Sequence, residues 1–146
     1  MKYNHLYWMN KVYKLSINAF KNKEIPVASI LVFKNKIINK SYNQTINKND
    51  PTAHAEIIVL RKSGKFLKKN LLNITMYVTL EPCLMCIGAI YNSKIKNLVY
   101  GASCNKIGSI NFLKNIYNNI YIKNKIKIIS GILTNKCSKI LKIFFK

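Results

Sequence analysis

The chain has 146 residues, of which 49% are hydrophobic, enough for one globular domain over 1–146 with a substantial core. Its 25 Lys and Arg residues against 4 Asp and Glu residues give a formal net charge of +21. No apolar run is long enough to span a bilayer, and the N-terminus lacks the basic-then-apolar order of a secretory signal. These features argue against a membrane or secreted protein. We expect a cytoplasmic protein whose four cysteines form no disulfides.

The positive charge has two explanations that the sequence leaves open. A surface this basic attracts polyanions such as nucleic acid. However, Arg61 is the single arginine, and Lys, Asn and Ile, whose codons are rich in A and T, occur throughout the chain. A biased genome composition would therefore produce much of the charge without any selection for binding.

Apolar periodicity predicts alternating helices and strands along the chain. A helix over 5–20 ends before Pro26, because proline disfavours helix in the residue before it. The following elements are expected in order: strands 27–33 and 37–42 joined as a hairpin, a polar loop 43–51, a helix from Thr52 to about Gly64, strand 74–80, helix 83–92, strand 98–100, a short helix 112–117, strand 126–130 and helix 132–145. This order predicts an α/β fold with three α-β-α layers around a five-stranded mixed sheet.

Two short segments carry the residue types of a metal centre: 51–56, PTAHAE, and 81–86, EPCLMC. One imidazole and two thiolates suit zinc, and cysteines three apart place both sulfurs on one face of a helix. The sequence therefore predicts that His54, Cys83 and Cys86 bind one Zn²⁺ per subunit.

Both segments have features of helix starts. Thr52 is a suitable N-cap, and Pro82 fits a first helical turn, where its missing N–H costs little. The positive end of a helix dipole also favours thiolate over thiol. We therefore expect the zinc ligands to lie at the beginnings of two helices.

Three protein ligands are typical of catalytic zinc, because a structural site is usually closed by four. Glu56 lies two residues from His54, which on a regular helix points its side chain away from the ligand direction. A carboxylate beside a zinc-activated water can transfer protons. Zinc deaminases share this pattern, H-x-E followed by P-C-x-x-C. We therefore expect Glu56 to be catalytic.

Other interpretations of these residues remain. Cys83 and Cys86 alone would suit a thioredoxin-like redox pair, which leaves His54 and Glu56 unexplained. A closed structural zinc site would need a fourth ligand, for which the candidates are Cys104, Cys137 and His5. Core cysteines with an unrelated surface histidine are the remaining possibility.

The residues around both segments, 49–56 and 77–86, resemble the bacterial tRNA-specific adenosine deaminases, of the cytidine-deaminase-like superfamily. The stretches 5–9, 24–27 and 131–133 extend the resemblance to nearly the whole chain. It implies hydrolytic conversion of the wobble adenosine of a tRNA anticodon to inosine by a zinc-activated water. It also implies a homodimer, the tRNA anticodon stem-loop as partner, and a target base flipped into a pocket.

The resemblance further assigns substrate-binding positions, each of which has a plainer structural explanation. Asn43 also suits a turn, Phe144 and Phe145 suit a core, and most lysines are merely solvated. The implied substrate-binding residues are Val27, Asn43, Ala55, Pro82, Lys106 and Phe145, with Phe144 as a neighbouring aromatic.

The chain departs from the family pattern after the fourth strand. Ser103 and Cys104 replace an arginine and an aspartate, and the loop 109–112 is altered. These changes affect contacts to RNA rather than the zinc chemistry. Two other functions stay open: a deaminase of free cytosine, guanine or a nucleoside such as cytidine, and a non-enzymatic zinc or RNA-binding module.

Overall fold

The computed structural model describes residues 2–69, 73–104, 110 and 125–146. Its elements are α1 (His5–Lys21), β1 (Ala28–Phe33), β2 (Lys36–Tyr42), α2 (Ala55–Lys62), α3 (Gly64–Lys69), β3 (Thr75–Leu80), α4 (Leu84–Asn92), β4 (Asn97–Ala102), β5 (Lys127–Ile129) and α6 (Thr134–Phe144). The sequence predicted all of these except the short α3. The helix expected at 112–117 lies outside the described residues. None of the described helices is long and apolar enough to cross a membrane.

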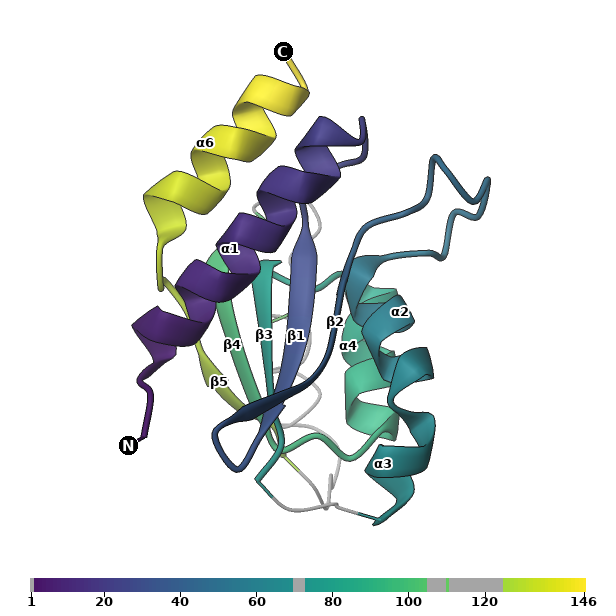
Figure 1. The fold of residues 1–146 in the computed structure, drawn as a ribbon, viewed down its shortest axis with the longest axis vertical. Coiled ribbons are helices and arrows are strands. Elements are labelled where there is room, and N and C mark those ends of the chain that lie inside the picture. The colour runs from purple at the N-terminus through teal and green to yellow at the C-terminus, as the bar shows by residue number, and fades with distance from the viewer. Residues whose placement is uncertain (1, 70–72, 105–109, 111–124) are drawn as a thin grey trace.

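The strands form one mixed sheet in the order β2-β1-β3-β4-β5. β1 is antiparallel to both β2 and β3, whereas β4 is parallel to β3 and β5. Helices α1 and α6 lie side by side on one face, and α2 and α4 lie side by side on the other (Figure 1). The prediction of an α/β fold with a five-stranded mixed sheet between two helical layers is therefore confirmed.

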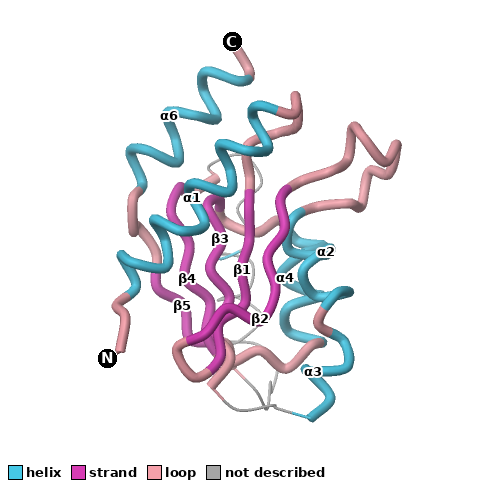
Figure 2. The backbone as a smooth tube through the Cα atoms, in the orientation of Figure 1, coloured by secondary structure: helices cyan, strands magenta, loops and turns pink. Residues whose placement is uncertain are grey.

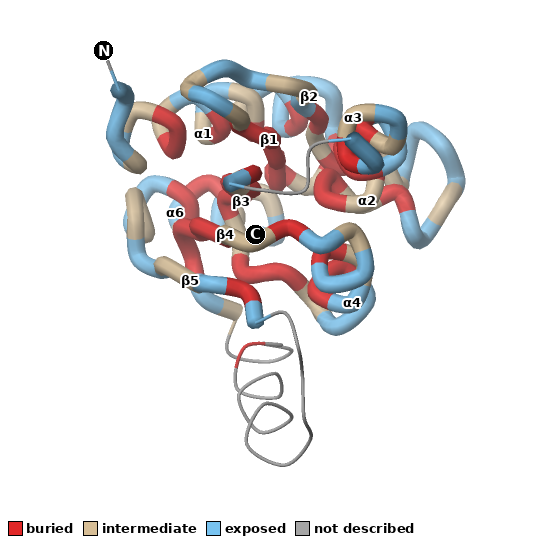
Figure 3. Tube along the Cα trace, turned by 90° about the horizontal axis from the view of Figure 1, so that it is seen from below, coloured by how far each residue is buried: buried red, intermediate tan, exposed pale blue. Residues whose placement is uncertain are grey.

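The central strands are buried on both faces of the sheet. Along β1, Ala28, Ile30 and Val32 belong to the core beneath α1 and α6, whereas Leu31 belongs to the core beneath α2 and α4. β3 and β4 alternate in the same way. Figure 3 shows the buried positions concentrated on the strands and on the helix faces that meet them. A strand covered on both faces reads as a continuous apolar run, as β1 does.

The connections bring the starts of α2 and α4 to the same end of the sheet. β3 leads directly into α4, and the loop after β2 returns to α2 at the end where β3 finishes (Figure 2). In α/β sheets, ligands bind at the carboxyl ends of the parallel strands. The topology therefore makes this end the place to look for a functional site.

The structure corrects both predicted helix starts. The N-cap of α2 is His54 rather than Thr52, whose amide and hydroxyl both donate to Asp50 Oδ1, at 2.8 and 2.7 Å. The N-cap of α4 is Cys83, so Pro82 precedes the helix instead of lying in its first turn. Before α2, the bonds of Thr52 to Asp50 keep the chain extended as far as His54. Before α4, Pro82 keeps it extended as far as Cys83.

Gly101 in β4 allows α6 to approach the sheet closely. A Cβ at this position would lie 2.8 Å from Cys137 Sγ and 3.0 Å from the carbonyl oxygens of Ile132 and Thr79. Two of these three atoms belong to the main chain, so a side-chain rotation cannot relieve the clash. The packing of α6 therefore depends on glycine here.

Replacing Gly101 with alanine is expected to lower the free energy of unfolding by about 1–3 kcal/mol, the usual cost of overpacking a core. Urea denaturation measures this change. Gly64→Ala is the matched control, because a Cβ there meets nothing within 4 Å. Equal stability of the two variants would contradict this account of α6 packing.

Candidate metal centre

Three side chains from two helix starts meet at the carboxyl end of β3. His54 and Cys83 are N-cap residues with extended backbone, at ψ 153° and ψ 174°. Neither side chain makes a capping hydrogen bond, which leaves both directed away from their own helices. Cys86 follows in the first turn of α4 and is buried. The arrangement places one imidazole opposite two sulfurs.

The distances fit a tetrahedral metal ion. Cys83 Sγ lies 3.6 Å and Cys86 Sγ 3.4 Å from His54 Nδ1, and all three ligand atoms lie within 4.8 Å of one another. Tetrahedral bonds to zinc of about 2.3 Å for sulfur and 2.0 Å for nitrogen would separate the sulfur and nitrogen atoms by about 3.5 Å. The three residues can therefore bind such an ion with little rearrangement.

The three side chains of the cluster shift one another's pKa values. Hydrogen bonds from Cys86 and then His54 lower the pKa of the Cys83 thiol to about 4. The same bond to Cys83, together with burial, raises the pKa of Cys86, and the bond with Cys83 raises the pKa of His54. Binding of a divalent cation would require all three side chains to be deprotonated, as metal ligands must be.

Glu56 lies beside this cluster in the first turn of α2 and is only 4% exposed. Burial raises the pKa of its carboxyl group, and a main-chain hydrogen bond opposes this effect in part. A carboxyl group whose pKa is moved towards neutrality is suited to both accepting and releasing a proton.

In the described part of the chain, the metal-binding group consists of three side chains, and the suggested fourth ligands lie elsewhere. His5 Nδ1 is 2.8 Å from the Tyr77 hydroxyl, and Cys137 is buried in the core beneath α1 and α6. Cys104 donates its amide to Glu81 Oε1. None of the four cysteines, all of which belong to the described residues, forms a disulfide bond. The cluster therefore has the composition of an open rather than a closed site.

The predicted substrate-binding residues are distributed unevenly around this cluster. The Asn43 amide N–H donates to the Val27 carbonyl at 2.9 Å, and both residues are buried. Ala55, which follows His54, is fully buried, and its carbonyl accepts the Ser41 hydroxyl at 2.6 Å. Pro82 is also buried.

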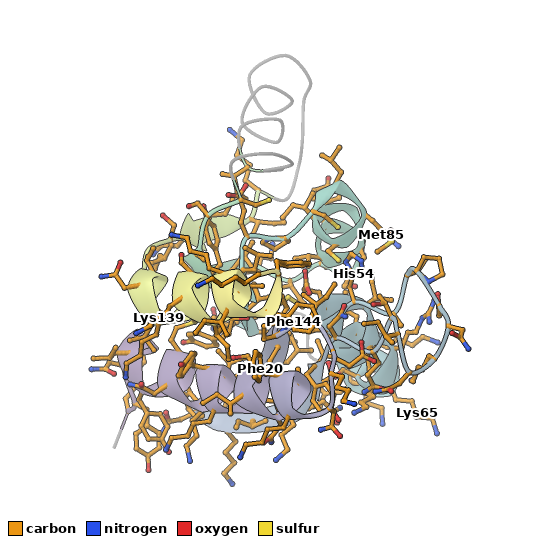
Figure 4. The ribbon with its side chains drawn as sticks, turned by 90° about the horizontal axis from the view of Figure 1, so that it is seen from above. Phe20, His54, Lys65, Met85, Lys139 and Phe144 are labelled. Atoms are coloured by element: carbon orange, nitrogen blue, oxygen red, sulfur yellow. The ribbon has the colours of Figure 1, made fainter. Side chains whose placement is uncertain are left out.

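The two remaining substrate-binding predictions lie apart from these residues or cannot be placed. Phe145 is 67% exposed at the end of α6, and its ring contacts Phe144. Phe144 faces Phe20 of α1, whereas His54 lies beside the other helical layer (Figure 4). Lys106 lies outside the described residues.

The structure reveals two buried carboxylates to which sequence reasoning gave no function. Glu24 accepts the amides of Ile46 and Asn47, in the loop that leads to His54. Glu81 accepts the amides of Cys104 and Ile110. The signal in the sequence that could have drawn attention to Glu24 and Glu81 is that the chain contains just four acidic residues.

Loss of one sulfur should abolish metal binding. We expect Cys86→Ser to purify with less than a tenth of the metal of the parent protein, because ligand deprotonation and geometry both change at a buried position. Elemental analysis after dialysis measures the metal content. Cys104→Ser is the matched control and should keep it. Unchanged metal in Cys86→Ser would remove this residue from the ligand set.

Comparison with known proteins agrees with the geometry. A family model described as MafB19-like deaminase matches residues 3–146. A tRNA-specific adenosine deaminase of Buchnera aphidicola (subsp. Schizaphis graminum) is 51% identical over 141 residues, covering 96% of this chain and 93% of that protein. The corresponding protein of Haemophilus influenzae is 46% identical, over 84% of this chain and 72% of its own length.

Solved structures give the same result. A structure from work on A-to-I editing by tRNA:A34 deaminases at the wobble position of transfer RNA superposes with a TM-score of 0.82 and 32% identity, covering 92% of this chain and 99% of that one. A guanine deaminase of Nitrosomonas europaea has a TM-score of 0.83 at 19% identity, covering 97% of this chain and 84% of that one, which shows a shared fold alone. The chain belongs to the bacterial tRNA-specific adenosine deaminase family, within the MafB19-like deaminases.

Proposed function

We propose that the protein hydrolyses the wobble adenosine of a tRNA anticodon to inosine, with release of ammonia. One observation carries the proposal: His54, Cys83 and Cys86 stand within ligand distance of one another beside the buried Glu56. They do so in a chain that shares 51% identity with a tRNA-specific adenosine deaminase. The whole chain, 1–146, forms one deaminase domain in this proposal, since strands from both halves build a single sheet.

The cofactor of this reaction is one Zn²⁺ per subunit, held by His54, Cys83 and Cys86. The donor set supports zinc, because thiolate and imidazole ligands in tetrahedral arrangement are those it prefers. When bound, zinc would lower the pKa of a water molecule towards neutrality and so supply a nucleophile at neutral pH. The four cysteines form no disulfide, which is consistent with the reducing cytoplasm expected from the sequence.

Glu56 performs the proton transfers. Its carboxylate accepts one proton from the attacking water and delivers it to N1 of the base as oxygen bonds to C6. It then carries the remaining proton of that oxygen to the amino group on C6, so that the C6–N bond breaks and ammonia leaves. A carboxyl group with a raised pKa can act in both directions near neutral pH. Its position in the first turn of α2, two residues after His54, ties it rigidly to the metal ligand.

The substrate base occupies a pocket formed by Val27, Asn43, Ala55 and Pro82. The main-chain bond between Asn43 and Val27 joins two of these residues across the β2 and β1 ends. Asn43 is the one polar side chain of this group, and its amide reaches Thr45 Oγ1 at 3.1 Å. It can therefore exchange this bond for one to the nucleoside. Phe145 and Lys106 contact the RNA around the flipped base.

The anticodon stem-loop is the partner that the charge favours. At +21, the protein attracts a phosphate backbone strongly, and only Glu24, Asp50, Glu56 and Glu81 oppose it. Three of these acids are buried, so the described surface is almost free of negative charge. Ser103 and Cys104 make fewer contacts to RNA than the arginine and aspartate that they replace.

A homodimer forms through α4 in this proposal. Leu84 and Tyr91 lie seven residues apart on one stripe of this helix and are 47% and 36% exposed. Met85 beside them is 38% exposed. An apolar surface next to a functional site is typical of an interface. Burying it would also enclose the site.

Removing the carboxylate tests the mechanism. Glu56→Gln should retain zinc and slow deamination of an anticodon stem-loop with wobble adenosine by at least about 10²-fold, the usual share of general acid–base catalysis. Mass spectrometry of the digested RNA detects inosine, and elemental analysis checks the metal. Full activity in Glu56→Gln would contradict the assigned role. Turnover of free adenosine, cytidine or guanine, but not of the stem-loop, would contradict the assigned substrate.

A charge placed in the apolar surface tests the dimer. Met85→Glu should convert a dimer into a monomer, because burying an unpaired carboxylate is costly. Size-exclusion chromatography with light scattering gives the mass. Ile143→Glu is the matched control, as this residue is 52% exposed but lies on α6. A dimeric Met85→Glu variant, or a monomeric parent protein, would contradict the proposed interface.

A further inference from the structure

Glu24 has an unusual environment for an acidic residue. Its side chain is 0% exposed. Oε1 accepts the amide of Ile46 at 3.1 Å, and Oε2 accepts the amide of Asn47 at 2.7 Å. Burying a carboxylate costs several kcal/mol unless hydrogen bonds compensate it. These two main-chain bonds are therefore the reason that a carboxylate is tolerated here.

The bonded amides belong to the segment 43–54, which connects the predicted pocket with the metal-binding cluster. Within it, Asp50 donates its amide to Thr45, Ala53 to Asp50, and Gln44 to Ala53, with distances of 2.9–3.1 Å. The segment begins at Asn43 and ends at His54. The segment is therefore held by hydrogen bonds among its own main-chain groups. Two further contacts attach it to the rest of the protein: Glu24 bonds to its middle, and the Val27 carbonyl bonds to its start.

We propose that Glu24 is a positioning residue for the deamination reaction, which holds the segment 43–54 in the shape that binds the substrate. It acts through the Ile46 and Asn47 amides and touches neither the metal ligands nor the base. The proposal rests on the proposed function for its kinetic consequence. A carboxylate is needed because it offers two acceptors and no donor.

Glutamine tests this requirement at constant size. In Glu24→Gln one acceptor becomes an NH₂ donor that faces a main-chain N–H, so one charge-assisted bond is lost and the other weakens. Such bonds contribute about 1.5–3 kcal/mol, or about 10- to 150-fold in the opening equilibrium. Hydrogen exchange followed by NMR should therefore speed up at least about tenfold at Ile46 and Asn47. Glu81→Gln is the matched control, since it should speed exchange at Cys104 and Ile110 instead.

Kinetics separates positioning from general destabilisation. When a binding-competent conformation is only partly populated, the apparent affinity falls by that fraction. Glu24→Gln should raise KM for the stem-loop by about tenfold, with a smaller change in kcat and unchanged zinc content. Asn18→Ala, an exposed uncharged change on α1, should leave KM within about twofold. Glu24→Asp, which keeps the charge but shortens the reach, should fall between the parent protein and Glu24→Gln and replaces that variant if it fails to fold.

The proposal is overturned if exchange at Ile46 and Asn47 is unchanged in Glu24→Gln. It is equally overturned if zinc content and kcat fall together while KM stays constant, because Glu24 would then support the metal site alone. Its failure is distinguishable from failure of the proposed function. A parent protein that does not deaminate the stem-loop refutes the function, whereas the exchange comparison still decides whether Glu24 fixes the segment.

Discussion

The convergence of two helix starts on one point is the constraint on which the rest of the structure depends. His54 and Cys83 are both N-cap residues, so each is the last extended residue before its helix and directs its side chain outward. Cys86, in the first turn of α4, is the third member of the cluster. Because α2 and α4 pack on each other and on the same face of the sheet, the separations between these three side chains are fixed by the core rather than by a flexible loop.

Three of the four acidic residues of the chain are buried. Glu56 lies beside the candidate metal-binding cluster, and Glu24 and Glu81 each accept two main-chain amides. A carboxylate that receives two N–H groups can order a loop without any basic partner, which suits a chain so rich in lysine. The described surface therefore carries mainly positive charge, which would attract the phosphate backbone of an RNA.

The ligand cluster and the layer order could be predicted from the sequence because both are local patterns. The spacing of Cys83 and Cys86 and the burial of β1 follow from helix and strand periodicity. The exact start of α2 could not be predicted. The Thr52 amide and hydroxyl bond to Asp50, and these bonds compete with a role for Thr52 as the N-cap. The role of Glu24 was also missed, because its partners lie 22 and 23 residues away and are main-chain groups that leave no trace in composition. Catalytic and RNA-binding roles for individual residues stay predictions.

The central claim is that one imidazole and two thiolates hold a zinc ion and leave a coordination position for solvent. X-ray absorption spectroscopy at the zinc edge of the purified protein tests it most directly. The account predicts two sulfur ligands at about 2.3 Å and two lighter ligands, nitrogen or oxygen, at about 2.0 Å. A shell of three or four sulfurs, or the absence of stoichiometric zinc from protein purified without chelators, would contradict it.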